Sequence, residues 1–467
     1  MSFLHGIEVV ELSGGPRPIE TSKSAVIGLV GTAPRGPVNT PTLIAGSRKE
    51  AVEVFGEQDG VSTIPDALDA IFDQIGAAVV VINVLPQTAA AEKEYTFDSD
   101  NLVTLDHERA ISSTVTVTST DGQTTYEADT DYTVYKGVVS KVEGGALDSV
   151  TTVNVGYDHT DPDSLAISDV SGGVDATTGE YEGVQALLAA ESVVHLSPRL
   201  LIAPGFTGLL DDTGAVDPGS KNVVDDLLGV AERLRAVVIA DGPNTTDAMA
   251  KTFRTQFDNA RLFIVDPYVK VFSPVTDTET TQPASARVAG IIARSDNQRG
   301  FWYSPSNRPV SGITGTARPI DFTMGDNNAR ANLLNENNVA TVIHQDGYRL
   351  WGNRSACSDK KWMFLSVRRT ADMINDALMR CHLWAVDENI TASYLESVTR
   401  GVNNFLRHLK SIGAIIGGEC WADPEINTPD QIQLGRVTFD FDFTPPYPAE
   451  RLTFRSRLVN NYLKEIV

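Results

Sequence analysis

The sequence predicts an α/β fold, with a mainly parallel sheet flanked by helices, an inserted β-rich module and extended β arms at both ends. Apolar strands alternate with helical patterns both before residue 86 and after residue 180. These strands are apolar throughout, which is typical of a parallel sheet covered on both faces. A stretch rich in Thr, Val and Tyr separates the two halves, and it predicts the inserted module.

The first half of the core begins soon after residue 20. Ser47, with Glu50 three residues later, forms a capping box, and Pro65 is typical of the first turn of a helix. Strand, helix and apolar strand in succession favour parallel pairing. The elements expected here are strand 24–30 (SAVIGLV), a helix from Ser47 to Phe55, a helix over 66–75 and strand 77–85 (AAVVVINVL).

Residues 87–179 are expected to form the inserted module. The stretch ISSTVTVTSTDGQTTYEADTDYTVYKG has strand composition, and Asp121-Gly122 is typical of a hairpin turn. Segment 86–195 holds 4 Lys and Arg against 20 Asp and Glu, and the whole chain has a net charge of −23. Such an acidic segment is most simply a solvated, outward-facing surface module.

After residue 180 the α/β pattern returns. Helix 221–235 precedes a strand ending at Asp241, helix 246–258 precedes a strand ending at Asp266, and helix 285–294 follows. Strands on both sides of the module therefore belong to one domain. The predicted division is an N-terminal arm over 1–20, a core over 21–86 and 180–435, the module over 87–179, and a C-terminal hairpin and arm over 436–467.

The stretch RVTFDFDFTPPYPAERLTFRSRL (436–458) alternates apolar and polar residues on both sides of a proline-rich joint. This pattern predicts a hairpin, and an aromatic hairpin alone is marginal in water, which favours pairing with a strand from another chain. An edge hairpin covered by its own domain is the alternative. The residues expected in inter-subunit strand exchange are Phe3, Ile7, Val9, Val437, Phe439, Phe441, Phe443, Leu452, Phe454 and Leu458.

Helix 393–410 is expected to open with a capping box formed by Ser393 and Glu396. Its apolar residues fall on one side at helical spacing. Another side carries the polar stripe Arg400, Asn403, Arg407 and Lys410. A solvated helix face explains this stripe, and so does a contact with an acidic partner.

The composition excludes several classes of function. A net charge of −23 argues against direct binding of nucleic acid. The longest apolar run, 76–85, falls far short of the roughly 20 residues that span a bilayer, so no membrane insertion is expected. The N-terminus does not resemble a signal peptide, which predicts synthesis in the cytoplasm. Three scattered cysteines predict neither disulfides nor a zinc site, and we expect no cofactor.

Asp241 and Asp266 provide the alternative interpretation, an enzyme of hydrolase or nucleotide-binding type. Both end predicted parallel strands, where open α/β sheets bind ligands. Asp is equally common at strand ends as a helix cap or turn residue. The chain contains neither GxSxG nor HExxH, and its phosphate-loop-like segment 214–221 (GAVDPGSK) lacks the required order of residues.

Long segments of the second half resemble the tail sheath proteins of contractile-tailed bacteriophages, which are similar to the sheaths of R-type pyocins. The resemblance covers about 181–465 and, more loosely, 1–85, and it leaves the role of the module open. It is carried by 181–206 (YEGVQALLAAESVVHLSPRLLIAPGF), 234–241 (LRAVVIAD), 306–315 (SNRPVSGITG), 333–358 (LLNENNVATVIHQDGYRLWGNRSACS), 381–391 (CHLWAVDENIT) and 435–458.

The resemblance implies a structural protein, not an enzyme, whose core has a subtilisin-like topology. Its subunits are expected to form stacked hexameric rings around a tail tube, joined by strand-donating arms, and to contract when the baseplate fires. The implied partners are further copies of the chain and the tail tube, baseplate and tail terminator proteins. The implied location is the virion tail, assembled in the cytoplasm of a bacterial host. An acidic surface-display protein that binds a receptor is a further alternative.

Overall fold

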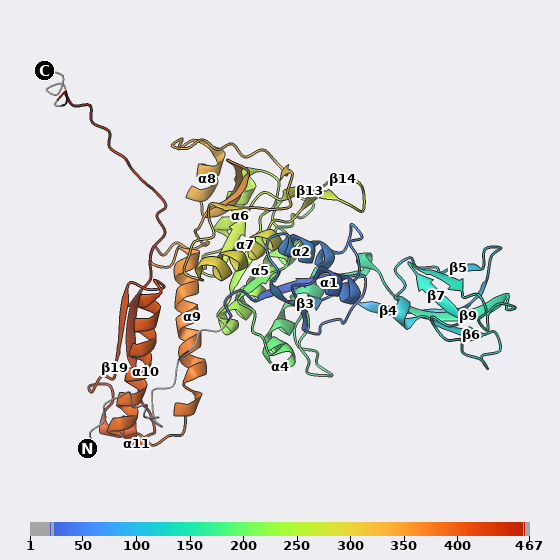
Figure 1. Cartoon of the computed structure of the whole chain (residues 1–467), viewed down its shortest axis with the longest axis horizontal. Coiled ribbons are helices and arrows are strands. Elements are labelled where there is room, and N and C mark those ends of the chain that lie inside the picture. Colours follow the sequence, from blue (N-terminus) through green and yellow to red (C-terminus); the bar gives the residue numbers. More distant parts are fainter. Residues whose placement is uncertain (1–18, 20–22, 461, 463–467) are drawn as a thin grey trace, which may run out of the picture.

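The chain folds around a nine-stranded sheet with helices on both faces (Figure 1). The computed structural model describes residues 19, 23–460 and 462. The strand order across the sheet is β15-β18-β17-β12-β11-β10-β1-β3-β2. The bounds are β1 Ile27–Gly31, β2 Thr42–Ala45, β3 Ala78–Asn83, β10 Leu200–Ile202, β11 Val237–Asp241, β12 Leu262–Val265, β15 Arg308–Pro309, β17 Val339–His344 and β18 Tyr348–Trp351.

The centre of this sheet is parallel, as the sequence predicts. Strands β17, β12, β11, β10, β1 and β3 pair in parallel, and β2, β18 and β15 add antiparallel edges. All residues of β1 are buried. A strand buried on both faces needs a layer of helices on each side, which explains its continuous apolar sequence.

Two hydrophobic clusters cover the two faces. Ile27 and Leu29 of β1 pack in the cluster that contains α2 and α7, whereas Val30 packs in the cluster that contains α5 and α6. The period of two along β1 therefore divides its side chains between the two layers. The helices of these layers are α1 Arg48–Phe55, α2 Thr63–Phe72, α4 Ala190–Val194, α5 Pro218–Leu234, α6 Asp247–Thr255, α7 Ser285–Arg299 and α8 Arg330–Glu336, with the 3₁₀ helix η3 Gly183–Ala189.

The predicted helices are present, with shifted ends. The Ser47 side chain accepts a hydrogen bond from the Glu50 N–H at 3.3 Å, and this cap begins α1. Helix α2 begins at Thr63, before the expected 66, and α7 continues to Arg299, beyond the expected 294.

The module is a separate β-rich body with its own core. It contains two three-stranded sheets, β4-β9-β6 and β5-β8-β7. The Ser119 N–H donates to the Thr124 carbonyl across the predicted Asp121-Gly122 turn, where Gly122 has φ 69°. The strands are β4 Gln87–Thr96, β5 Leu102–Thr104, β6 Thr116–Ser119, β7 Tyr132–Tyr135, β8 Val138–Lys141 and β9 Thr152–Thr160, and the core includes Val103, Val117, Val139, Val153 and Val155.

The module ends earlier than the sequence predicts. Strands β4 and β9 form its stalk, with Gln87 opposite Thr160. The following segment contains α3 (Ile167–Ser171), and its Val170 is fully buried in the core cluster that covers α5. Residues 161–179 therefore belong to the core, and the boundary predicted at 179 is wrong.

Few contacts join the module to the core, which predicts that it can be removed. The contacts include a half-buried ion pair between Arg109 and Asp59 at 3.0 Å and a hydrogen bond from the Gln87 side chain to the Gly36 carbonyl at 2.9 Å. We expect that a chain in which a short Gly/Ser linker replaces 88–159 still folds into a soluble core. Its melting temperature should change by only a few degrees, because the lost ion pair between Arg109 and Asp59 is partly exposed and contributes about 1 kcal/mol or less. Circular dichroism measures this. A chain that no longer accumulates in soluble form would contradict the separate folding of the two bodies.

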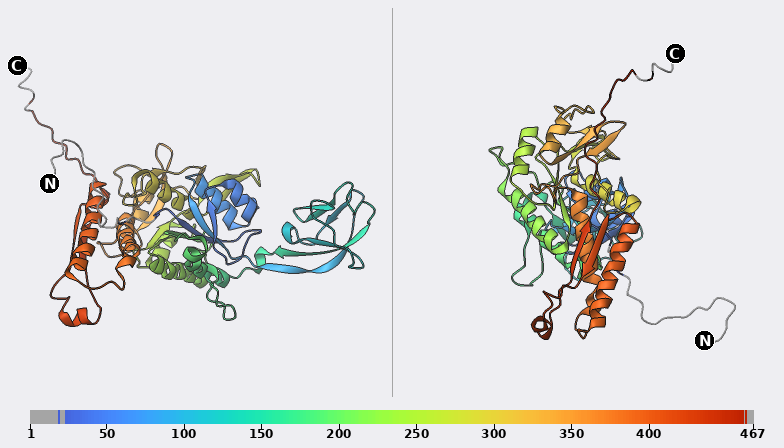
Figure 2. Two further views of the ribbon diagram at one scale, coloured as in Figure 1. Left: turned by 60° about the horizontal axis from the view of Figure 1, so that its bottom comes forward. Right: turned by 90° about the vertical axis from the view of Figure 1, so that its left-hand side faces the viewer.

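The C-terminal region lies at the opposite end of the molecule from the module (Figures 1 and 2). Helix α9 (Leu365–Cys381) runs along the core and leads into this region. The further elements are α10 Ala392–Ser411, β19 Gly417–Trp421, α11 Pro429–Gln433 and β20 Asp440–Thr444, and a small sheet of the core consists of β13 Val269–Ser273, β14 Thr278–Gln282 and β16 Gly315–Thr316.

Buried ion pairs fix α9 to the core. Arg369 of α9 binds Asp296 of α7, and Asp372 of α9 accepts two hydrogen bonds from Arg261, at 2.6 and 2.9 Å. The side chains of Arg369 and Asp296 are almost fully buried. Removal of one partner of a buried pair typically costs about 3–5 kcal/mol, so these contacts hold α9 on the core.

Candidate assembly surfaces

The C-terminal region is built on a two-stranded sheet packed against α10. Strands β19 and β20 pair antiparallel, with Cys420 opposite Phe441 and Glu419 opposite Asp442. Phe441 and Phe443 pack, half-buried, against a cluster to which α10 contributes Val402, Phe405, Leu406 and Leu409. The predicted alternation is thus confirmed from Phe439 to Thr444, because one face of this stretch meets the helix and the other faces solvent.

The predicted hairpin is wrong in its second strand. The structure pairs β20 with β19, which the sequence analysis did not identify, and not with the segment that contains Leu452 and Phe454. Val437 precedes β20 and lies outside the strand. Residues 451–459 have no assigned secondary structure, and their large apolar side chains are exposed, Leu452 by 75%, Phe454 by 91% and Leu458 by 99%.

The chain that follows β20 is held on the core up to Glu450. The Arg354 Nε donates to a Glu450 carboxylate oxygen at 2.7 Å, and a second guanidinium nitrogen binds the other oxygen. Tyr447 packs edge to face on Phe364, with ring centroids 6.2 Å apart. Beyond this anchor the chain leaves the body of the molecule (Figures 1 and 2).

The segment 347–354 (GYRLWGNR) contains β18 and supplies Arg354, the partner of Glu450. The pairing of Arg354 with Glu450 could not be predicted from the sequence. Glu450 is a single glutamate after a proline-rich stretch, and no sequence pattern indicates that it pairs with Arg354.

The predicted N-terminal residues Phe3, Ile7 and Val9 lie outside the described residues. Ile19 is described, and it packs against the same cluster as Phe441 and Phe443. Ile19 therefore lies beside the two-stranded sheet.

Helix α10 differs from its prediction in two ways. Its N-cap is Thr391, which accepts from the Tyr394 N–H at 3.1 Å, and not Ser393. Asn403 is not part of a solvated stripe, because its side chain binds the backbone of β19. Arg400, Arg407 and Lys410 are exposed and form what we call the basic face of α10. Arg400 on this face also forms an exposed ion pair with Glu396.

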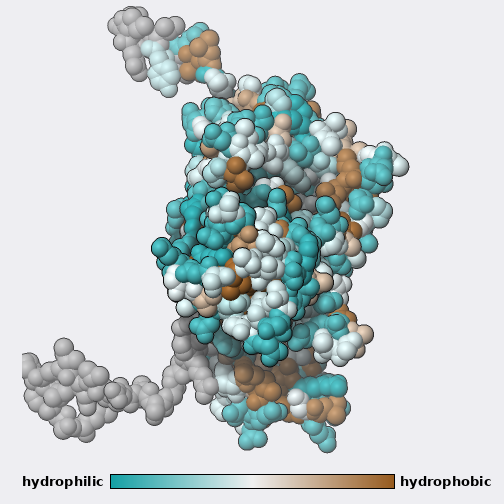
Figure 3. Space-filling model, turned by 90° about the vertical axis from the view of Figure 1, so that its right-hand side faces the viewer, coloured by the Kyte–Doolittle hydropathy of each residue, from teal (hydrophilic) through white to brown (hydrophobic). Residues whose placement is uncertain are grey.

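Apolar side chains are also exposed where α9 ends. Met379 is 61% exposed, Leu383 77% and Val386 62%. Figure 3 views the molecule from the end that carries the module, and it shows hydrophobic residues gathered in the lower part of the surface. In Figure 1, α11 and the end of α9 lie at the same height. Exposed apolar side chains of this kind are typical of surfaces that meet another protein.

The candidate catalytic residue Asp241 is a structural cap. Its carboxylate, fully buried at the end of β11, accepts hydrogen bonds from the N–H groups of Ala284 and Ser285 at 2.7 and 2.8 Å and from the Ser285 hydroxyl. Burial raises the pKa of Asp241 to about 6. The carboxylate thus satisfies the first donors of α7, whose own N-cap residue, Ala284, has no side-chain acceptor.

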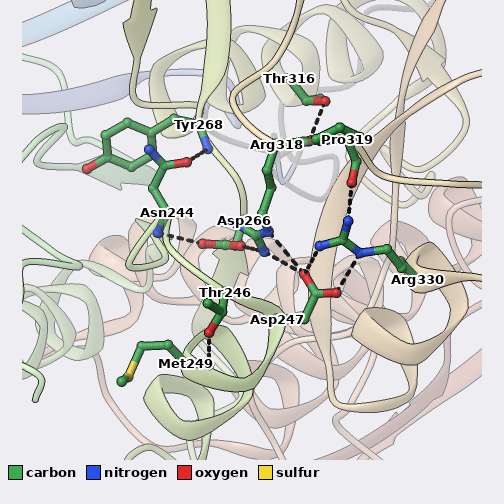
Figure 4. Close-up of polar contacts among 10 residues, drawn as sticks. All are labelled: Asn244, Thr246, Asp247, Met249, Asp266, Tyr268, Thr316, Arg318, Pro319 and Arg330. Carbon is green, nitrogen blue, oxygen red and sulfur yellow. Dashed lines mark hydrogen bonds and ion pairs between the residues drawn. The ribbon is translucent and has the colours of Figure 1, made fainter. Parts of the chain in front are cut away.

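Asp266 belongs to an ion-pair network on the same edge of the sheet (Figure 4). It binds Arg318 and accepts from the Asn244 N–H at 2.8 Å. Arg318 also binds Asp247 at 2.9 Å, and Asp247 binds Arg330 at 2.8 Å. Burial raises the pKa of Asp266, although the charge of Arg318 acts in the opposite direction. These carboxylates are occupied by structural partners.

We expect Asp241→Ala to destabilise the fold, because it leaves the buried donors of Ala284 and Ser285 without an acceptor. The expected loss is about 1–3 kcal/mol in the free energy of unfolding. Urea unfolding followed by circular dichroism measures this, with Asp163→Ala as the control at an exposed carboxylate. Equal stability of the two variants would contradict the capping role.

The described part of the chain contains no group of three or more His, Cys, Asp or Glu residues that could hold a metal ion. Within the same residues, no helix is both long and apolar enough to cross a membrane. Cys357 and Cys420 are buried free thiols, and the Cys381 side chain is half-buried.

Three family models match the chain in order. They describe the tail sheath protein Gp18 domain III N-terminal region (24–84), the phage tail sheath protein central domain (179–356) and the phage tail sheath C-terminal domain (357–458). The interval between the first two matches contains the module.

Relatives with similar sequences cover the whole chain. A protein named as a prophage major tail sheath protein of Pseudomonas aeruginosa (strain UCBPP-PA14) is 36% identical, covering 100% of this chain and 99% of the relative. The tail sheath protein of Burkholderia phage BcepMu is 35% identical over 99% of this chain and 98% of its own length. The tail sheath protein of Escherichia phage P2 is 30% identical over 100% and 98%.

Solved structures share the fold at lower identity. The helical sheath of the anti-feeding prophage in the contracted state matches with a TM-score of 0.59 and 16% identity, over 98% of this chain and 99% of that one. The sheath complex of the extracellular contractile injection system PVC in the contracted state matches with a TM-score of 0.58 and 14% identity, over the same shares.

Proposed function

Because the chain belongs to the tail sheath family of contractile phages, we propose that it polymerises as stacked six-fold rings around a tail tube and contracts to drive that tube through the host envelope. It is a structural subunit of a contractile tail sheath. The observation that carries this conclusion is identity of 30% or more to phage sheath proteins over the full length. Sedimentation velocity tests it, since a sheath subunit gives particles far larger than one chain.

We propose that terminal segments link neighbouring subunits by strand exchange. The described C-terminal segment supports this, because residues 451–459 are exposed and extended although they carry Leu452, Phe454 and Leu458. The N-terminal residues Phe3, Ile7 and Val9 have the same period of two. From the Glu450 anchor, the 17 residues 451–467 can reach at most about 60 Å.

We propose that the basic face of α10 contacts acidic groups of the tail tube. Arg400, Arg407 and Lys410 are exposed in a chain of net charge −23. Helix α10 and the module lie at opposite ends of the long axis (Figure 1). A subunit that meets the tube through α10 therefore carries its acidic module outward, where like charges on neighbours are screened over about 8 Å at physiological salt.

The remaining partners and the location follow from membership of the family. We propose that the ends of the sheath meet baseplate and tail terminator proteins, and that the virion tail is assembled in the cytoplasm of a bacterial host. The parallel sheet with helices on both faces supports a subtilisin-like topology for the core. We assign no catalytic role to Asp241 or Asp266, since structural partners occupy both carboxylates.

A further inference from the structure

The C-terminal chain is fastened to the start of α9 before it leaves the subunit. Tyr447 packs on Phe364, the residue that precedes α9. Arg354, which binds Glu450 through two nitrogens, also pairs with the backbone of Phe364 in an isolated β-bridge. The Glu450 anchor and the start of α9 therefore form one packed unit.

The N-terminal chain is fastened to the next turn of the same helix. Arg369 of α9 donates to the Ser24 carbonyl at 3.1 Å, and the Ser24 hydroxyl donates to Asp296 at 2.7 Å. Asp296 is the buried ion-pair partner of Arg369. The backbone and the side chain of Ser24 thus both bind this ion pair, shortly before β1 begins at Ile27.

The two attachments lie close together along α9, although they hold opposite ends of the chain. Phe364 and Arg369 are five residues apart, which corresponds to about 7.5 Å along the axis of a helix. The ion pairs of Arg369 with Asp296 and of Arg261 with Asp372 hold this part of α9 on the core. The start of α9 is therefore a common base for both attachments.

We propose that the start of α9 is the common attachment site of both terminal arms, and that Arg354 and Arg369 are positioning residues that fix where each arm leaves the subunit. This inference rests on the strand exchange proposed above. A subunit linked through both arms would then hold its neighbours from two neighbouring points on one helix.

The Glu450 anchor also sets the free length of the C-terminal arm. With the anchor closed, the free arm consists of the 17 residues 451–467. Without it, the chain would be free from Pro445, directly after β20, and the arm would have 23 residues. The six added residues extend its reach by about 20 Å. A longer linker lowers the effective concentration of the segment that it carries, so the anchor favours assembly.

Distances between two spin labels test the attachment site within one subunit. In a Cys381→Ser background, labels at Lys23→Cys and Arg451→Cys lie at exposed positions next to the two attachments. Labelled chains are diluted into an excess of unlabelled protein, so that only distances within a chain are measured. We expect a single narrow distribution of distances, and we expect Arg354→Ala to broaden it by several ångström.

Two further variants make the C-terminal result specific. Arg349→Ala is the matched control, because Arg349 lies on the same segment but binds Asn307 and not the arm. The charge exchange Arg354→Glu with Glu450→Arg should restore the narrow distribution. A distribution that stays narrow in Arg354→Ala would overturn the role of the Glu450 anchor.

The N-terminal attachment is tested with the same labels. Arg369→Lys should broaden the distribution, because one ammonium group replaces the fork that binds both Asp296 and the Ser24 carbonyl. Arg368→Lys is the control, since Arg368 binds Asp372 within α9. If Arg369→Lys does not fold, Ser24→Ala gives the test, with a smaller broadening expected. No broadening in any folded variant of this attachment would contradict the positioning role of Arg369.

Insertions test what the anchor does in the assembly. The sequence Gly-Ser-Gly-Ser is inserted either between Thr444 and Pro445, before the anchor, or between Glu450 and Arg451, after it. We expect the second insertion to raise the protein concentration needed for assembly several-fold and the first to leave it unchanged. In an Arg354→Ala background the two insertions should act alike. Sedimentation of cylinders over a range of concentrations measures this.

The outcomes separate the anchor from strand exchange itself. An effect of the first insertion as large as that of the second, with Arg354 in place, would show that the anchor does not fix the arm, and it would overturn the proposed attachment site. If neither insertion changed assembly, the arm would not link subunits. That result would overturn strand exchange, and the attachment site with it.

Discussion

Removing residues 451–467 is expected to give a folded protein that no longer polymerises. Leu452, Phe454 and Leu458 are at least 75% exposed, so their deletion takes nothing from the core of the subunit. In the assembly the same segment would contribute several backbone hydrogen bonds of about 0.5–1.5 kcal/mol each and bury Phe454, which adds about 1.5–3 kcal/mol. We therefore expect an unchanged melting temperature and a complete loss of cylinders.

Calorimetry and electron microscopy of the truncated chain measure the two results. Leu452→Ser with Phe454→Ser should reproduce the loss of assembly, whereas Thr453→Ser, on the other side of the strand, should not. The outcome that would contradict the role of this segment is normal cylinders from the truncated chain.

Reversal of Arg400, Arg407 and Lys410 to Glu is expected to abolish assembly around the tube while leaving the subunit folded. These side chains are exposed, so their replacement breaks no buried contact. Each exposed ion pair with the tube contributes about 0.2–1 kcal/mol, and rings of subunits repeat it many times. Such contacts are also weak enough singly to separate during contraction.

Tube-filled tails counted by electron microscopy at increasing salt measure this effect. A matched triple reversal of Lys49, Lys93 and Lys360, which are exposed elsewhere, should leave tube binding unchanged. If the α10 variant gave tube-filled tails with the salt dependence of the unaltered protein, the basic face would be a solvated surface and nothing more.

The core could be predicted from the sequence because its physical signals are local. A strand such as 77–85 is apolar on both faces, and Ser47 with Glu50 marks a helix start. Both signals depend on residues that are close together in the chain. The end of the module shows where prediction from local signals fails. Residues 161–179 are polar on average, and only a few apolar residues, such as Val170, fix this segment to the core.

The assembly surfaces could be predicted only in part. Alternation in 437–444 indicates which face of the strand is buried, but it carries no information on the neighbouring strand. Strand β19 (GGECW) was missed because its two glycines weaken the strand signal. Helical spacing placed Asn403 with the basic residues, and only the position of β19 reveals its pairing with Cys420.

Electron microscopy of the purified full-length chain tests the central claim most directly. We expect hollow cylinders of stacked six-subunit rings, whose cross-sections show the acidic module outside and α10 lining the lumen. A homogeneous population of monomers, at concentrations where related sheath proteins assemble, would contradict it.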